Sequence, residues 1–93
     1  MAFKTHQVTS YQYSFDARTG SPGRLGLWGE MGRIADIGFV DDASAVPEPE
    51  IDANLTSATA WFKRSALSGL IDLLRNQKPV LVRIDDEGDV DVL

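Results

Sequence analysis

The acidic segment Asp85–Asp89 is the first group of side chains in this 93-residue chain that could do chemistry. It offers four carboxylates within five residues, and Ca²⁺ prefers oxygen ligands of this kind. An EF-hand is excluded, because Arg83 stands where its first aspartate belongs and the chain ends before a twelfth-position glutamate. We therefore predict a solvated turn between two strands and assign no metal ligand, with a weak surface calcium site as the alternative.

Patterns for catalysis are equally sparse. His6 is the single histidine and there is no cysteine, which removes disulfides, thiolate nucleophiles and the usual zinc sites. Neither a G-x-S-x-G nucleophile pattern nor a phosphate-binding glycine motif occurs. Asp16, Glu30 and Asp36 could pair for acid–base work, but their spacing does not distinguish them from ordinary surface acids. The sequence indicates no catalytic residue and no cofactor, and it favours a protein that is not an enzyme.

The net charge of −5 is unevenly distributed and bears on the choice of partner. Residues 41–54 carry five acids and no base, whereas residues 55–78 carry four bases and one acid. Because an acidic chain repels phosphate, the composition argues against a nucleic-acid partner. No apolar run approaches the ~20 residues that cross a bilayer, and the first ten residues lack the apolar core of a signal peptide. Together with the absence of cysteine, this predicts a cytoplasmic protein with no membrane partner.

The elements that must position these side chains begin with a strand rich in aromatic residues. Threonine and aromatic side chains alternate with polar ones over residues 3–15, which predicts a half-buried strand, most clearly from Val8 onward. Tyr11 and Tyr13 fall on the side that we expect to face the core. His6 falls on the polar side of the same pattern.

Two further strands are predicted before residue 41. A turn over Thr19–Gly23 leads into a glycine-rich second strand, Arg24–Met31. Within it, Gly26 and Gly29 allow a bulge or a close approach of another backbone. The third strand, Arg33–Val40, is partly apolar on both faces, as expected of a central strand, and the short connections favour antiparallel pairing.

A loop and one long helix follow. Residues 41–54 contain two prolines and five acids and predict an extended, solvated loop. Residues 55–76 contain no proline and predict the helix, whose apolar arc of roughly 180° is wider than the ~100° stripe of a simple surface helix. The arc comprises Leu55, Phe62, Ala66, Leu67, Leu70, Ile71, Leu73 and Leu74. Trp61, Arg64 and Arg75 lie outside the arc, on the polar side of the predicted helix.

The C-terminal residues predict a hairpin that completes the fold. Val80–Ile84 and Val90–Leu93 are strands, and Gly88 supplies the positive φ that such a turn needs. The last strand is a candidate sheet edge, open to pairing with another chain. The order strand–strand–strand–helix–strand–strand over residues 1–93 predicts a single α+β domain. We expect one antiparallel sheet of about five strands, with the long helix packed on one face.

The leading functional hypothesis is a non-enzymatic protein-interaction or assembly domain that forms a homodimer. It depends on the wide apolar arc, the free strand edge and the position of Trp61 with Arg64 and Arg75 on the polar side of the helix, because tryptophan and arginine are enriched at interface hot spots.

Two alternatives stay open. The first is a small-molecule binding or enzymatic domain with a pocket between the aromatic strand and the glycine-rich segment, formed by Tyr11, Tyr13, Arg24 and Trp28. The second is an acidic inhibitor or nucleic-acid mimic, which requires the acidic clusters at residues 41–52 and 85–91 to share one face.

Overall fold

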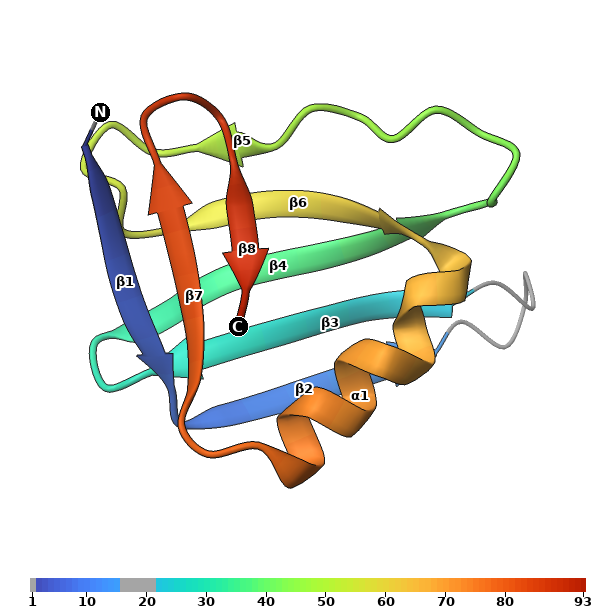
Figure 1. The fold of residues 1–93 in the computed structure, drawn as a ribbon, viewed down its shortest axis with the longest axis horizontal. Coiled ribbons are helices and arrows are strands. Elements are labelled where there is room, and N and C mark those ends of the chain that lie inside the picture. Colours follow the sequence, from blue (N-terminus) through green and yellow to red (C-terminus); the bar gives the residue numbers. More distant parts are fainter. Residues whose placement is uncertain (1, 16–21) are drawn as a thin grey trace.

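Two β-sheets and one helix form the structure, a computed structural model that describes residues 2–15 and 22–93 (Figure 1). The larger sheet has the strand order β2-β3-β4-β6-β5, and the smaller sheet has the order β1-β7-β8. The strands are β1 (Phe3–Val8), β2 (Ser10–Phe15), β3 (Pro22–Gly29), β4 (Gly32–Val40), β5 (Glu50–Ile51), β6 (Ala58–Lys63), β7 (Val80–Asp85) and β8 (Val90–Val92). A 3₁₀ turn, η1 (Arg64–Ala66), leads into the helix α1 (Leu67–Asn76).

The predicted α+β class is confirmed, but the single antiparallel sheet was wrong, since the strands form two sheets and β4 pairs parallel with β6. Several parts of the predicted fold are present. Strands β2, β3 and β4 pair antiparallel, and β4 is central, between β3 and β6. The β7–β8 hairpin turns at Gly88, whose φ is +96°, and β8 lies at the edge of its sheet. The predicted turn Thr19–Gly23 lies partly outside the described residues, and Asp16 lies outside them entirely.

Glycines in β3 behave as predicted. The pairing of β3 with β4 shifts register between Leu27 and Trp28, which is a bulge. A Cβ atom added to Gly29 would lie 2.8 Å from the carbonyl oxygen of Gln7 in β1. Only a glycine allows the two backbones to approach this closely.

The predicted first strand is two strands, because the chain passes from one sheet to the other at Thr9. β1 pairs with β7 in the small sheet, whereas β2 pairs with β3 in the large one. At the corner, the backbone N–H of Thr9 donates to the carbonyl oxygen of Trp28 (2.8 Å). The change of sheet also changes which side chains face inward. The prediction for His6 was wrong, since His6 pairs with the buried Val82 on the inner side of the small sheet.

The prediction of one continuous helix over residues 55–76 was also wrong. The helix begins only at Leu67, and residues 58–63 form β6, which pairs parallel with β4. In β6 the small side chains of Ala58 and Ala60 are buried against the core while Thr59 and Trp61 face the other way, which is the period of a strand. The predicted helical arc is therefore not formed, although Pro79 does follow the end of the helix.

The core lies between the two sheets and the helix. Leu25, Leu27 and Ile37 come from the large sheet and are fully buried, as are Val82 and Ile84 from the small sheet. The small sheet crosses in front of the large one, and α1 lies beside it against the same face (Figure 1). The helix contributes Leu74 to the core. Among the described residues, no helix is long and apolar enough to cross a membrane. In the part of the chain that the structure describes, no helix or strand covers the opposite face of the large sheet (Figure 1).

Candidate functional site

The uncovered face of the large sheet gathers the side chains best suited to binding. Leu25 and Leu27 of β3 point into the core, so Arg24, Gly26 and Trp28 point away from it. Neighbouring strands extend this surface. Gly26 pairs with Asp36 and Trp28 with Arg33 across β3 and β4, and Gly38 pairs with Trp61 across β4 and β6. We call this surface the tryptophan face; it comprises Arg24, Gly26, Trp28, Arg33, Asp36, Gly38, Thr59 and Trp61.

Both tryptophans of the chain lie on this face, and each rests on a glycine. A Cβ atom on Gly26 would lie 2.5 Å from Cη2 of Trp28, and one on Gly38 would lie 2.8 Å from Cδ1 of Trp61. Contacts this short are not tolerated, so any other residue would displace the indole. The two glycines therefore let the rings lie down on the sheet, where each indole is partly buried before any partner arrives.

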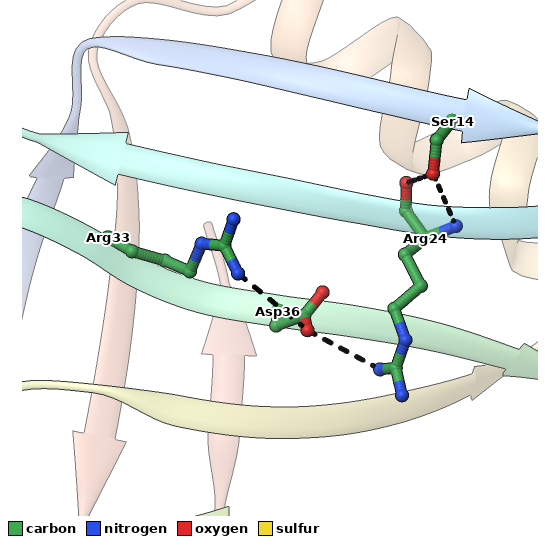
Figure 2. A network of polar contacts seen from close by, with 4 residues as sticks. All are labelled: Ser14, Arg24, Arg33 and Asp36. Atoms are coloured by element: carbon green, nitrogen blue, oxygen red, sulfur yellow. Dashed lines mark hydrogen bonds and ion pairs between the residues drawn. The ribbon is translucent and has the colours of Figure 1, made fainter.

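Three charged side chains, Arg24, Arg33 and Asp36, lie on the same face as the tryptophans, and Figure 2 shows how they contact one another. Asp36 lies between two guanidinium groups, with its Oδ2 atom 3.6 Å from Nη1 of Arg24 and 4.0 Å from Nη1 of Arg33. The guanidinium carbon of Arg33 also lies 4.8 Å from the ring centroid of Trp28, at cation–π distance. On the neighbouring strand, the Ser14 hydroxyl accepts from the backbone N–H of Arg24 and donates to its carbonyl oxygen, both at 3.2 Å.

These ion pairs leave binding capacity for a partner. The side chains of Arg24 and Arg33 are 51% and 55% exposed, and that of Asp36 is 27% exposed. At such exposure an ion pair contributes less than about 1 kcal/mol. A guanidinium has five N–H donors, and one carboxylate shared between two arginines engages few of them. The face can therefore bind additional carboxylates at little cost to its own structure.

The predicted interface residues Trp61, Arg64 and Arg75 are not brought together as predicted. Trp61 lies on the tryptophan face, whereas Arg64 starts the 3₁₀ turn and pairs with Asp41 (Nη2 to Oδ1, 3.1 Å). Arg75 lies in the last turn of α1. The polar helical side on which the three were expected to lie does not exist, because the helix does not include Trp61 or Arg64.

The alternative pocket is divided between the two faces of one sheet. Tyr11 and Tyr13 pair with Leu27 and Leu25, so they lie on the inner side of the sheet, where Tyr11 is still 38% exposed, while Arg24 and Trp28 lie on the outer side. Tyr13 packs against the core, and its buried hydroxyl has no hydrogen-bond partner among the described residues. These four residues cannot line one cavity.

Structure and sequence thus select overlapping parts of the same surface. Trp61, from the interface hypothesis, lies on the same sheet face as Arg24 and Trp28, from the pocket hypothesis. Sequence reasoning missed Arg33 and Asp36 as members of the site. Their signal was the pattern of β4, where the charged residues Arg33 and Asp36 interrupt an apolar strand, but assigning them to the site required the register with β3 and β6.

A hollow of about 640 Å³ lies beside His6, between β1, the β3–β4 turn and the turn at residues 52–57. The His6 Nε2–H donates to the carbonyl oxygen of Leu55 (2.8 Å), a residue with a φ of +58°. This bond holds the left-handed backbone of Leu55 and uses the imidazole structurally. His6 therefore supports the turn.

Asp52 organises the same turn. Its Oδ1 accepts from the backbone N–H of Thr56 (2.7 Å) and of Ser57 (3.3 Å), and its Oδ2 accepts from the Thr56 hydroxyl (2.5 Å). These bonds, that of the Thr56 hydroxyl above all, lower the pKa of Asp52 from its usual 3.8, although desolvation acts in the opposite direction.

Asp85 and Asp42 also accept hydrogen bonds from backbone N–H groups. Asp85 is buried, and its Oδ1 accepts from the backbone N–H groups of Glu87 (3.0 Å) and Asp89 (2.9 Å), which closes the β7–β8 turn. Asp42 accepts from the backbone N–H of Ser65 (3.0 Å), and its carbonyl oxygen accepts from Nζ of Lys63. Within residues 2–15 and 22–93, no three histidine or acidic side chains gather in a way that could hold a metal ion. Each acidic cluster read from the sequence therefore contains carboxylates that hold backbone N–H groups of a turn.

Comparison of the chain with protein-family models, with curated proteins and with solved structures gave no match. The functional argument therefore depends on the geometry of the tryptophan face.

Proposed function

We propose that this chain is a non-enzymatic protein-interaction domain that assembles as a homodimer through the tryptophan face. The observation that carries the proposal is the placement of both tryptophans on one uncovered sheet surface, each seated on a glycine and flanked by Arg24 and Arg33. Tryptophan and arginine dominate the binding free energy of protein interfaces. The proposed location is the cytoplasm, in keeping with a chain that has no cysteine.

Preorganisation of the two rings supports this function. A side chain that must be immobilised on binding costs about 0.5–1.5 kcal/mol of conformational entropy. Trp28 and Trp61 already lie against Gly26 and Gly38, so much of this cost is met during folding. The exposed side of each ring is then free to pack against a partner at little further cost.

A two-fold axis through this surface would place the same residues on both sides of the interface. In such a dimer, Asp36 of one chain can meet an arginine of the other. A catalytic function has less support, because His6 is engaged in a structural bond with Leu55.

Sedimentation equilibrium of the purified chain at micromolar concentration tests the proposal. We expect a dimer for the native chain and a monomer for Trp61→Ala, with thermal melts to show that the variant is folded. Met31→Ala is the matched control, because Met31 is fully exposed in the β3–β4 turn and is not one of the residues of the tryptophan face. A native chain that sediments as a monomer, or a Trp61→Ala chain that remains a dimer, would contradict the proposed function.

A further inference from the structure

The segment Val46–Glu50 carries apolar side chains and carboxylates, which complement the indoles and arginines of the tryptophan face. On the basis of the homodimer proposed above, we propose that this segment of one chain lies across the tryptophan face of the other, with its apolar side chains on the two indoles and its glutamates beside the two arginines. The interaction is reciprocal, so each chain supplies one face and one segment.

The segment is extended and restricted by proline, as segments that bind aromatic surfaces commonly are. Residues 45–49 have no regular secondary structure, and Val46 and Glu48 are exposed. Pro47 and Pro49 fix their own φ angles and keep the preceding residues extended. A proline-containing extended segment loses little entropy on binding and packs well on aromatic surfaces, which is how polyproline II ligands are recognised.

The spacing of the segment suits the spacing of the rings. The ring of Trp28 lies over Gly26 and that of Trp61 over Gly38, two residues further along the adjacent strand. With strands about 4.8 Å apart and a rise of about 3.3 Å per residue, these ring positions are roughly 8 Å apart. In a polyproline II helix, residues three apart share one face at a separation of about 9 Å. Val46 and Pro49 are such a pair.

Charge makes the segment a better occupant than a bare second face. At the centre of each tryptophan face, Arg24 and Arg33 share the carboxylate of Asp36, while Glu50, in register with Thr59, lies at the β5 edge of the same sheet face. Two such centres placed directly against each other would bring four guanidinium groups together with two carboxylates, which leaves a net positive charge there. Glu48 and Glu50 are exposed, and the two copies would supply four more carboxylates.

The fold places the segment where it can reach across. Glu50 begins β5 at the edge of the large sheet, in register with Thr59 of the tryptophan face. In one chain the preceding residues run along that edge (Figure 1). A two-fold axis near this edge would place the segment of each chain over the tryptophan face of the other.

A charge exchange between two full-length variants tests the proposal by sedimentation. The first variant, Arg24→Glu with Arg33→Glu, has an acidic face and an acidic segment. The second, Glu48→Lys with Glu50→Lys, has a basic face and a basic segment. We expect each alone to dimerise about tenfold more weakly than the native chain, or not at all, and their equimolar mixture to form a heterodimer. The matched control, Glu87→Lys with Asp91→Lys, changes the net charge equally at exposed acids elsewhere and should dimerise at least as well as the native chain.

A peptide titration identifies the ligand directly. A synthetic peptide of residues 43–52 contains no aromatic residue, so the tryptophan emission of the mixture reports only on the face. Added to the monomeric Glu48→Lys, Glu50→Lys chain, it should give a saturable change in emission that is lost when Arg24 and Arg33 are also replaced by glutamate.

Three results would overturn the inference. The first is a Glu48→Lys, Glu50→Lys chain that dimerises as the native chain does while Trp61→Ala does not; the tryptophan face would then remain the interface, and the proposed function would stand. The second is a peptide that leaves the emission unchanged when single-stranded oligothymidylate changes it, which would assign the face to nucleic acid. The third is a native chain that is monomeric, which removes the homodimer and this inference together.

Discussion

Two glycines decide how the tryptophans of this protein are presented at the scale of single residues. Gly38 lies on β4 and Trp61 on β6, so their contact depends on the pairing of two strands that are distant in sequence. A glycine in a strand normally weakens it, because it has no side chain to pack and loses more backbone entropy. Here the missing side chain is the space in which the indole lies.

Replacing Gly38 with alanine should displace the Trp61 ring. The new Cβ would lie 2.8 Å from Cδ1 and 2.9 Å from Nε1 of Trp61. Overpacking costs about 1–3 kcal/mol, partly offset by the roughly 0.5–1 kcal/mol that alanine gains over glycine in a strand. We expect a net loss of about 1 kcal/mol in the free energy of unfolding and, in a Trp28→Phe background, a red shift of tryptophan emission.

Gly69→Ala is the matched control for that substitution. Gly69 lies inside α1, and a Cβ there meets no atom within 4 Å. Alanine in a helix interior is better than glycine by about 0.8–1.0 kcal/mol, so this variant should be more stable, with unchanged emission. A Gly38→Ala chain that behaves like Gly69→Ala would contradict the described contact.

Asp52 predicts an acid-sensitive turn. Hydrogen bonds from Thr56 and Ser57 lower its pKa in the folded state below the usual 3.8, so the carboxylate contributes stability above that pH. This contribution is lost as the pH falls from 3.8 through the lower pKa of the folded state. Denaturant unfolding between about pH 2 and pH 6 should show a smaller decrease for Asp52→Asn than for the native chain. An identical pH profile for both would show that the carboxylate does not stabilise the turn.

At the scale of elements, β6 determines whether a tryptophan face exists at all. Residues 56–63 contain no glycine or proline, and in isolation they continue the helical pattern that follows. Tertiary contacts override that tendency. These residues pair parallel with β4 and bury Ala58 and Ala60 in the core. Both effects stabilise the strand more than one additional helical turn would stabilise a helix.

Enlarging Ala60 should therefore be costly. Its side chain is 2% exposed, and overpacking at such a position costs about 1–3 kcal/mol. We expect Ala60→Leu to lower the free energy of unfolding by that amount, measured by urea titration. The same substitution at Ala45, in the exposed loop, should change it by less than about 0.5 kcal/mol. Equal effects at both positions would be inconsistent with a buried β6.

At the scale of the whole molecule, the charge distribution sets the response to salt. The chain is acidic overall, yet the tryptophan face is rich in arginine, and several acids are engaged in turns on the remainder of the surface. Assembly through the segment Val46–Glu50 brings opposite charges together, and exposed ion pairs are screened beyond a Debye length of about 10 Å at 0.1 M salt.

Raising the salt concentration should therefore weaken the dimer. Between roughly 0.05 M and 0.5 M sodium chloride we expect the dissociation constant from sedimentation equilibrium to rise several-fold without complete dissociation, because the indole contacts are apolar. The Glu48→Lys, Glu50→Lys chain should show the opposite trend, since its like charges are screened. A native dimer that tightens with salt would mean that repulsion between the two faces is the larger effect.

Local patterns were sufficient for several features of this protein. The central strand Arg33–Val40, the hairpin around Gly88 and the α+β class follow from the period of hydrophobic residues and from turn chemistry, which act over a few residues. From the sequence, Gly26 and Gly29 also predict that another group approaches the backbone closely, but they do not identify that group.

Only the tertiary structure decided the rest, because each remaining feature depends on contacts between distant residues. The break at Thr9 arises because residues before it pair with β7 and residues after it pair with β3. Trp61 lies in a strand instead of a helix because β6 pairs with β4 and buries Ala60. The tryptophan face depends on the register of β3, β4 and β6, which joins residues 24 to 61 into one surface. A one-residue slip in any of these pairings would send the side chains to the other face of the sheet.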